Sequence, residues 1–167
     1  MTLLRYFLWL SLAVVLQVLL FNHLSLFGGI VLIYMVSLLK IPVEIRPSLQ
    51  IVIAFLTGFV IDSFCNTPGM HAFSAITVML VRMRVLRLFD NDPEYKNGSV
   101  NLNRFGLSVV FRYILTLVTF GAILLYGIEA FTLFNFTILL TKIVISVVLT
   151  MFIAIAIEFA SLKKTAS

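Results

Sequence analysis

Asp62 and His71 are the residues of this sequence whose side chains are best suited to chemistry. A carboxylate and an imidazole are sufficient for proton transfer, so one hypothesis makes them an acid–base or ion-binding pair at the mouth of a pathway. The segment 66–69 between them reads Asn-Thr-Pro-Gly, which is typical of a tight turn between two helices. We favour the hypothesis that Asp62 holds this turn, because no nucleophile motif is present and Glu129 is the only other carboxylate expected near that face.

The residues before and after this turn follow a helical pattern. Ala54, Gly58 and Asp62 recur at four-residue spacing, which places them on one face of a helix. Small residues at this spacing let two helix backbones approach closely in a membrane. Asn66 or Thr67 would cap the next helix, which Pro68 would begin. The candidate residues for helix packing or partner binding are Ala54, Gly58, Asp62, Thr67, Pro68, Gly69 and His71.

The composition of the chain indicates that a membrane surrounds these residues. Of the 167 residues, 62% are hydrophobic and 11% are charged, whereas a soluble domain has about 45–50% and about 25%. A soluble fold of this length could not bury so much apolar surface. The two histidines and the single cysteine lie at no spacing typical of a metal site or a redox pair. We therefore expect no catalytic residue, no metal, no cofactor and no enzyme activity.

Six apolar stretches divide the chain into predicted membrane spans. They cover residues 3–21, 26–41, 49–65, 71–88, 105–126 and 139–159. A span with its connection takes about 25 to 28 residues, so six of them fill the chain and leave no room for a soluble domain. The predicted fold class is an all-α integral membrane protein, in which residues 1–167 form a single polytopic membrane domain.

The last apolar stretch, 131–162, is too long for one upright span and contains Lys142. Two interpretations stay open. One long tilted helix would place the Lys142 ammonium inside the bilayer, which costs at least about 2.5 kcal/mol. Alternatively, residues 131–138 lie along the outer interface and the span covers 139–159, with Lys142 at the level of the headgroups. We prefer the second interpretation because it avoids this cost.

Basic residues predict the orientation of the chain. If the N-terminus is inside, ten of them face the cytoplasm, and at most Lys142 lies outside. These ten are Arg5, Lys40, Arg46, Arg82, Arg84, Arg87, Lys96, Arg104, Lys163 and Lys164. We therefore expect both termini in the cytoplasm, and the net charge of +5 reflects topology rather than binding of nucleic acid. The cluster Arg82, Arg84 and Arg87 is interpreted as a cytoplasmic basic patch against anionic lipid, or alternatively as a docking patch for a cytoplasmic partner.

Two polar stripes run along the last two predicted spans. Ser108, Arg112 and Thr116 recur every four residues in the fifth span. The stripe of the last span consists of Lys142, Ser146, Thr150, Ala154 and Glu158. A four-residue step drifts around a helix, so the second stripe favours a helix contact over a pore. Arg112 either snorkels to the interface or pairs with Glu158 at a comparable depth, and this pair is our candidate for an internal ion pair.

One set of positions is typical of a known family. The set comprises Gln17, Ile33-Tyr34, Pro42, Gly58-x-x-x-Asp62, Asn66-Thr67-Pro68-Gly69-Met70-His71-Ala72 and Arg82. Together with six spans and short tails, it resembles the MreD family of rod shape-determining membrane proteins over essentially the whole chain. That family is similar in architecture to the S components of energy-coupling-factor transporters, so the resemblance implies the S-component fold.

The resemblance implies a non-enzymatic scaffold of the cell-elongation (rod) complex in the bacterial cytoplasmic (inner) membrane. Such a scaffold supports lateral peptidoglycan synthesis and the regulation of cell shape. The implied partner is the transmembrane helix of MreC, a bitopic protein with a large periplasmic domain. The same complex would contain MreB, RodZ, RodA and its transpeptidase partner, and a homodimer within it stays open.

The alternative function is a solute-binding membrane subunit of an energy-coupling-factor type vitamin transporter. S components commonly dock on their motor module through alanines at four-residue spacing in the first helix, whereas the first predicted span here has only Ala13. The outer face also lacks an evident set of polar ligand-binding residues. We therefore prefer the scaffold.

Overall fold

The computed structural model describes residues 3–21, 28–90, 100, 102–130 and 135–163 of the chain. These residues form an all-helical fold, with no strand among them. The elements in chain order are α1 (Leu3–Leu16), the π-helical turn η1 (Gln17–Phe21), α2 (Ile33–Leu39), α3 (Pro47–Cys65), α4 (Met70–Phe89), α5 (Leu102–Glu129) and α6 (Phe136–Lys163).

Three helical segments in the described part of the chain are long and apolar enough to cross a membrane. They are Pro47–Cys65, Phe105–Glu129 and Phe136–Ala160. Their 19 to 25 residues correspond to about 28 to 38 Å of helix, against a hydrocarbon core of about 30 Å. The apolar window of the first helix, Tyr6–Leu20, is shorter, and α4 contains three arginines. The structure is thus an all-helical protein with three candidate membrane spans, and the six-span topology stays a prediction.

The second predicted span is wrong in its helical extent. Over 26–41 we expected a helix, but α2 has only 7 residues, or about 10 Å. The backbone from Gly28 to Leu32 is not helical, and Gly28 has a φ of +82°, which favours glycine. A run of apolar residues predicts burial, but it does not fix where the backbone finds its hydrogen-bond partners. Here the partners come from other helices.

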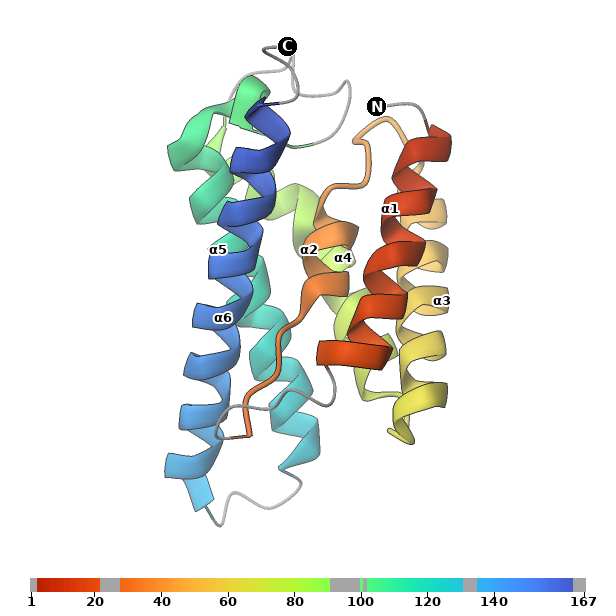
Figure 1. The fold of residues 1–167 in the computed structure, drawn as a ribbon, viewed down its shortest axis with the longest axis vertical. Helices are drawn as coiled ribbons and strands as arrows, with labels where there is room; N and C mark the ends of the chain where they lie inside the picture. The colour runs from red at the N-terminus through yellow and green to blue at the C-terminus, as the bar shows by residue number, and fades with distance from the viewer. Residues whose placement is uncertain (1–2, 22–27, 91–99, 101, 131–134, 164–167) are drawn as a thin grey trace.

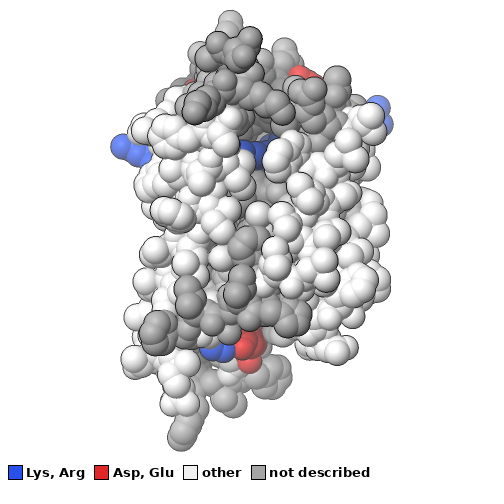
Figure 2. Space-filling view, viewed as in Figure 1, with Lys and Arg blue, Asp and Glu red and all other residues white. Residues whose placement is uncertain are grey.

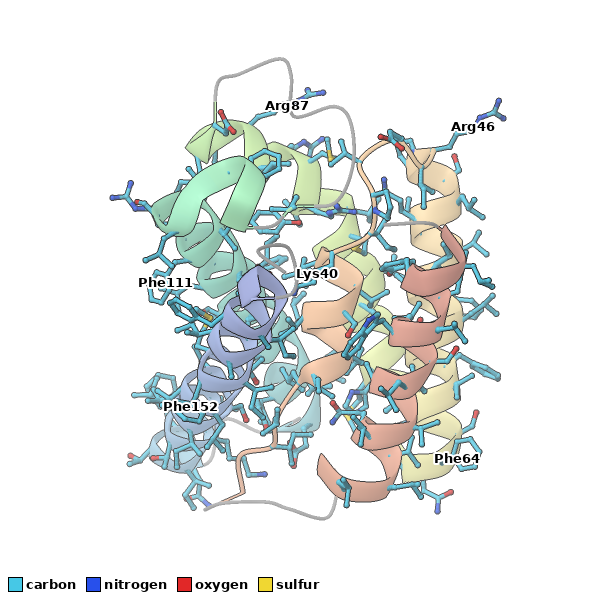
Figure 3. The ribbon with its side chains drawn as sticks, turned by 45° about the horizontal axis from the view of Figure 1, so that its top comes forward. Lys40, Arg46, Phe64, Arg87, Phe111 and Phe152 are labelled. Atoms are coloured by element: carbon cyan, nitrogen blue, oxygen red, sulfur yellow. The ribbon has the colours of Figure 1, made fainter. Side chains whose placement is uncertain are left out.

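Helix α2 occupies the centre of the molecule (Figure 1). It contacts α1 on one side, α5 and α6 on the other, and also α4. Tyr34 and Met35 of α2 are completely buried. The start of α1 and the end of α6 lie at the same end of the bundle, which we call the basic end because Arg46 and Arg87 extend from it (Figure 3). The opposite end carries the turn between α3 and α4.

The sides of the bundle are apolar. Figure 2 shows coloured charged groups toward the two ends of the visible face and an uncharged belt between them. Phe64, Phe111 and Phe152 point outward from α3, α5 and α6 (Figure 3). In α6, only 22% of the most apolar window is buried within the chain. A surface of this kind suits a lipid environment, because a soluble monomer rarely exposes such large apolar areas.

Candidate functional site

Many polar side chains of the interior lie around the two ends of α2. Three backbone amides at its start donate to side chains of other helices. The pairs are Ile30 with Tyr126 and with Ser146, Leu32 with Thr150, and Ile33 with Gln17, at N···O distances of 2.9–3.0 Å. Non-helical backbone at membrane depth occurs only where the protein buries it and satisfies its polar groups. These side chains therefore replace the hydrogen bonds that a longer α2 would make itself.

The polar stripe predicted along the last span contributes two of these partners. Ser146, Thr150, Ala154 and Glu158 are all buried, so most of the stripe faces inward. Its helix contact is made within the chain, with the segment that leads into α2. Gln17 lies where α1 passes into η1. It accepts the hydrogen bond of the Ile33 amide, a role that the sequence pattern alone did not reveal.

Arg82 of α4 lies at the other end of α2. Its guanidinium is completely buried and donates to the Ile41 carbonyl, to Tyr113 Oη at 2.8 Å and to Gln50 Oε1 at 3.0 Å. The Tyr113 hydroxyl in turn donates to the Leu39 carbonyl at 3.2 Å. Arg82 thus ties α3, α4 and α5 to the end of the central helix.

One of the three residues predicted for the basic patch, Arg82, is therefore not part of it, because it is buried. Arg82 shares a face of α4 with the buried residues Val78 and Leu86, each four positions away. Arg84 and Arg87 lie on the exposed side of α4 and remain available to lipid or to a partner. Helical spacing from apolar neighbours is the signal that separates Arg82 from the other two.

Asp62 caps helix α4 from the end of α3. Its Oδ1 accepts hydrogen bonds from the His71 amide at 3.0 Å and from the Thr67 hydroxyl, and its Oδ2 accepts one from the Ala72 amide at 2.9 Å. A carboxylate at this position satisfies free amides and also interacts favourably with the helix dipole. The helix–turn–helix held by Asp62 is thus present in the structure.

Some details of this turn differ from the sequence interpretation. Helix α4 begins at Met70 rather than Pro68, after Gly69 with a φ of +78°. Asn66 adopts a left-handed conformation and ends α3. The Thr67 hydroxyl bonds to Asp62 and not to the following helix. Because the cap comes from the preceding helix, the turn needs no local capping residue.

The small residues before Asp62 pack inside the molecule. Ala54 is completely buried. A Cβ atom built on Gly58 would lie 2.4 Å from the Ala72 Cα atom and 2.5 Å from its nitrogen, so only glycine permits this approach of α3 to α4. The face of Ala54, Gly58 and Asp62 is therefore a contact within the chain, which agrees with helix packing, one of the two roles predicted for these residues.

The ring of His71 forms no hydrogen bond with the Asp62 carboxylate in the described part of the chain. Its Nδ1 lies 3.2 Å from Tyr34 Oη, and the two rings pack edge to face with centroids 5.5 Å apart. The hydrogen bond between His71 and Asp62 is made by the His71 backbone amide. The arrangement serves the packing of α4 against α2 and leaves the proposed acid–base pair without a shared hydrogen bond between side chains.

The predicted ion pair between Arg112 and Glu158 is wrong. Glu158 lies 2.8 Å from the Nζ of Lys40, which follows the last turn of α2, and the Glu158 side chain is almost completely buried. Arg112 is exposed. Because α2 ends inside the bundle rather than in a loop, Lys40 reaches the depth of Glu158. The sequence interpretation placed Lys40 in the cytoplasmic loop.

Lys142 forms a second ion pair at the opposite end. Its Nζ lies 2.7 Å from Glu129 Oε1 and 5.9 Å from the centre of the Tyr126 ring. Figure 2 shows a blue and a red group side by side at this end. Residues 136–138 belong to α6, and 131–134 lie outside the described residues, so the interfacial position of 131–138 stays a prediction.

A small, partly open hollow lies between α5 and α6. Its lining is apolar except for Glu158 and consists of Leu107, Val110, Phe111, Ile114, Met151, Ala154, Ile155, Glu158 and Phe159. A helix with its side chains is about 10–12 Å across. The hollow is therefore far too small for a whole helix.

These features define an all-helical protein with membrane-length helices, in which most of the buried polar side chains bind backbone groups or one another. Within the described ranges, no group of three or more His, Cys, Asp and Glu side chains is placed to hold a metal ion. No protein-family model, curated protein or solved structure matches this chain.

Proposed function

We propose that the chain is a membrane scaffold of the cell-elongation (rod) complex, the function implied by its resemblance to the MreD family. In this proposal it lies in the bacterial cytoplasmic (inner) membrane with six spans and cytoplasmic termini, in an S-component-like fold. It binds the transmembrane helix of MreC and so positions the periplasmic domain of that protein for lateral peptidoglycan synthesis. MreB, RodZ, RodA and its transpeptidase partner belong to the same assembly.

The observation that carries this proposal is the use of the buried polar side chains. Gln17, Ser146 and Thr150 accept hydrogen bonds from backbone amides at the start of α2. Asp62 accepts hydrogen bonds from backbone amides at the start of α4, and Arg82 donates one to the Ile41 carbonyl at the end of α2. Polar groups bound to the chain's own backbone build a rigid framework, and function then resides on the outer surface.

The outer surface suits partners that lie in the membrane. Helix association in lipid lacks a hydrophobic drive and depends on shape, small residues and polar contacts. A rigid bundle with exposed helix faces can offer all three. At the basic end, Arg84 and Arg87 are exposed and supply positive charge for a cytoplasmic partner or for anionic lipid.

The solute-binding alternative receives less support from the same contacts. A solute site in the half near the α3–α4 turn would need polar groups that point into a cavity. Tyr126 and Ser146 are bonded to each other at 2.6 Å and to the Ile30 amide. Both oxygens already accept from the Ile30 amide, and one of the two hydroxyl hydrogens is used between them, so a solute would find only part of their hydrogen-bonding capacity.

Co-purification from detergent tests the proposed function. The tagged chain, expressed with MreC at normal levels, should recover MreC as a stable complex. A matched variant of the framework, Ser74→Ala, removes the hydrogen bond from Ser74 Oγ to the Gly121 carbonyl without touching the surface and should retain the complex. Recovery with an ATPase and a bound vitamin, in place of a bitopic protein, would overturn the proposal.

A further inference from the structure

Two ion pairs lie at two different levels of α6. Lys142 pairs with Glu129 of α5, and Glu158 pairs with Lys40, which follows α2. Lys142 and Glu158 are 16 positions apart in α6, or about 24 Å along the helix axis. The residues between them include none that is charged. The two ion pairs therefore bound an uncharged length of α6 of about 24 Å.

Helix α5 has an uncharged length of nearly the same extent. Arg112 and Glu129 are both exposed and 17 positions apart, or about 26 Å. Glu129 contacts Lys142 of α6 at one end. At the other end Phe111, the neighbour of Arg112, lines the same hollow as Glu158, so the levels of the charged groups agree between the two helices. We call the band of surface between these two levels the apolar belt.

The apolar belt is not taller on the side of α3 and α4. The outermost exposed large apolar side chains of α3 are Leu49 and Phe64, which are 15 positions apart, or about 22 Å. In α4 the exposed face from Phe73 to Arg84 spans 11 positions, or about 16 Å, before it reaches a charged group. The apolar belt is therefore about 25 Å high or less.

A belt of this height is shorter than the hydrocarbon core of a typical bilayer, which is about 30 Å thick. Tilting the helices would shorten the belt along the membrane normal and increase this difference. The long side chains of Arg112 and Lys142 can extend toward the headgroups, but Glu129 has a short side chain, 43% of which is exposed. In a hydrocarbon core of about 30 Å this carboxylate would lie among acyl chains, which is unfavourable.

The first residues of α6 lie beyond the apolar belt. Phe136 and Ile138 are exposed, and α6 begins beyond the α3–α4 turn at that end of the bundle (Figure 1). A thicker bilayer would cover these two side chains, but it would also cover the ion pair of Lys142 and Glu129. Aromatic and apolar side chains are tolerated at the level of the headgroups, whereas an exposed carboxylate in hydrocarbon is not. The ion pair therefore sets the edge of the belt.

We infer that the chain lies in a ring of bilayer whose hydrocarbon core is thinned to about 25 Å, and that it binds phospholipids with short acyl chains in preference to those with longer chains. A helix that is shorter than the local hydrocarbon thickness is accommodated when the bilayer thins around it, and each ångström of mismatch has a modest cost. Several helices with the same short apolar height add these costs around the perimeter of the bundle. The inference goes beyond the proposed scaffold function and does not depend on MreC.

Trp9 allows a direct test, because it is the single tryptophan of the chain and is 50% exposed on α1, whose apolar window Tyr6–Leu20 is also short. The full chain is reconstituted in mixtures of brominated phosphatidylcholine, which quenches tryptophan fluorescence on contact, and unbrominated phosphatidylcholine of varied chain length. Lipids with chains of about 14 carbons should displace the quencher at least about twofold better than lipids with about 18 carbons. Equal displacement, or better displacement by the longer chains, overturns the inference.

A second reporter measures the lipid preference on the other side of the bundle. In the variant that combines Trp9→Phe with Phe152→Trp, the tryptophan lies on the exposed face of α6 (Figure 3). It should report the same preference, because the two levels of charge are shared by α5 and α6. A preference for the longer chains at this position would show that the first residues of α6 belong to the belt, and would overturn a height of about 25 Å.

Removal of the ion pair provides a matched comparison. Glu129→Leu combined with Lys142→Leu extends the uncharged surface of α6 to Phe136, about 9 Å further, and should move the preference of the Phe152→Trp reporter toward longer chains. The exchange Glu129→Lys with Lys142→Glu keeps a charge pair at the same level and should leave the preference unchanged. If the first variant does not fold, the two reporters in the parent sequence still decide. An unchanged preference in a folded variant without the pair also overturns the inference, whereas the scaffold function is tested separately by the recovery of MreC.

Discussion

Replacement of Asp62 by asparagine should weaken the connection between α3 and α4. The Asp62 carboxylate accepts three hydrogen bonds, from the Thr67 hydroxyl and from the amides of His71 and Ala72. Asparagine has nearly the same shape but only one accepting oxygen. The NH₂ group of asparagine takes the place of the second oxygen, Oδ2. It cannot accept the hydrogen bond that the Ala72 backbone amide donates there.

The magnitude follows from these contacts. A buried hydrogen bond to a charged group contributes about 1.5–3 kcal/mol, and a negative charge at a helix start adds about 0.3–1 kcal/mol. Asp62 is 4% exposed, so water does not replace the lost partner. We therefore expect Asp62→Asn to lower the free energy of unfolding by about 2–4 kcal/mol.

Unfolding by denaturant in detergent micelles, followed by circular dichroism, measures this change, and the amount of protein in membranes should fall with it. Ser63→Ala is the matched control, because Ser63 is the next residue, is exposed and bonds only to the Phe59 carbonyl. It should change the free energy of unfolding by less than about 0.5 kcal/mol. Normal stability and abundance of Asp62→Asn combined with loss of function would refute the structural role and return Asp62 to the acid–base hypothesis.

Two further substitutions test the packing and the centre of the fold with the same unfolding assay. Gly58→Ala forces a methyl group against the Ala72 backbone and should destabilise the protein by about 1–3 kcal/mol. The control is Gly127→Ala, where the space is open, and it should be neutral or slightly stabilising. Equal effects of the two substitutions on stability would contradict the close contact between α3 and α4. Thr150→Val leaves the Leu32 amide without its acceptor and should cost about 1–3 kcal/mol, whereas the exposed Thr141→Val should cost almost nothing. A Thr150→Val protein as stable as the parent would show that this amide finds another partner.

Short-range features of the fold followed from the sequence. The helix–turn–helix around Asp62 could be predicted because its partners lie only five to ten residues further along the chain. Turn residues and four-residue spacing report such local relations directly. The ends of α3 to α6 also lie within four residues of the predicted spans.

Long-range pairs could not be predicted in the same way. Arg82 contacts the Ile41 carbonyl 41 residues away, and the charge patterns of the loops gave no reason to bury it. Glu158 pairs with Lys40 because α2 is short and ends inside the bundle. The hydropathy of a segment indicates whether the segment is buried. It does not indicate which of its backbone groups must form hydrogen bonds with residues of distant helices.

The short α2 has a consequence for biosynthesis. Helices of fewer than about 12 residues are marginal on their own, and the amides of Ile30 and Leu32 depend on residues 116 and 118 positions later. A ribosome-bound chain that ends before α6 should therefore keep residues 28–41 open to protease, and protection should appear only once α6 has been released. The segment that leads into α2 should therefore reach its final place only after α6 has been made.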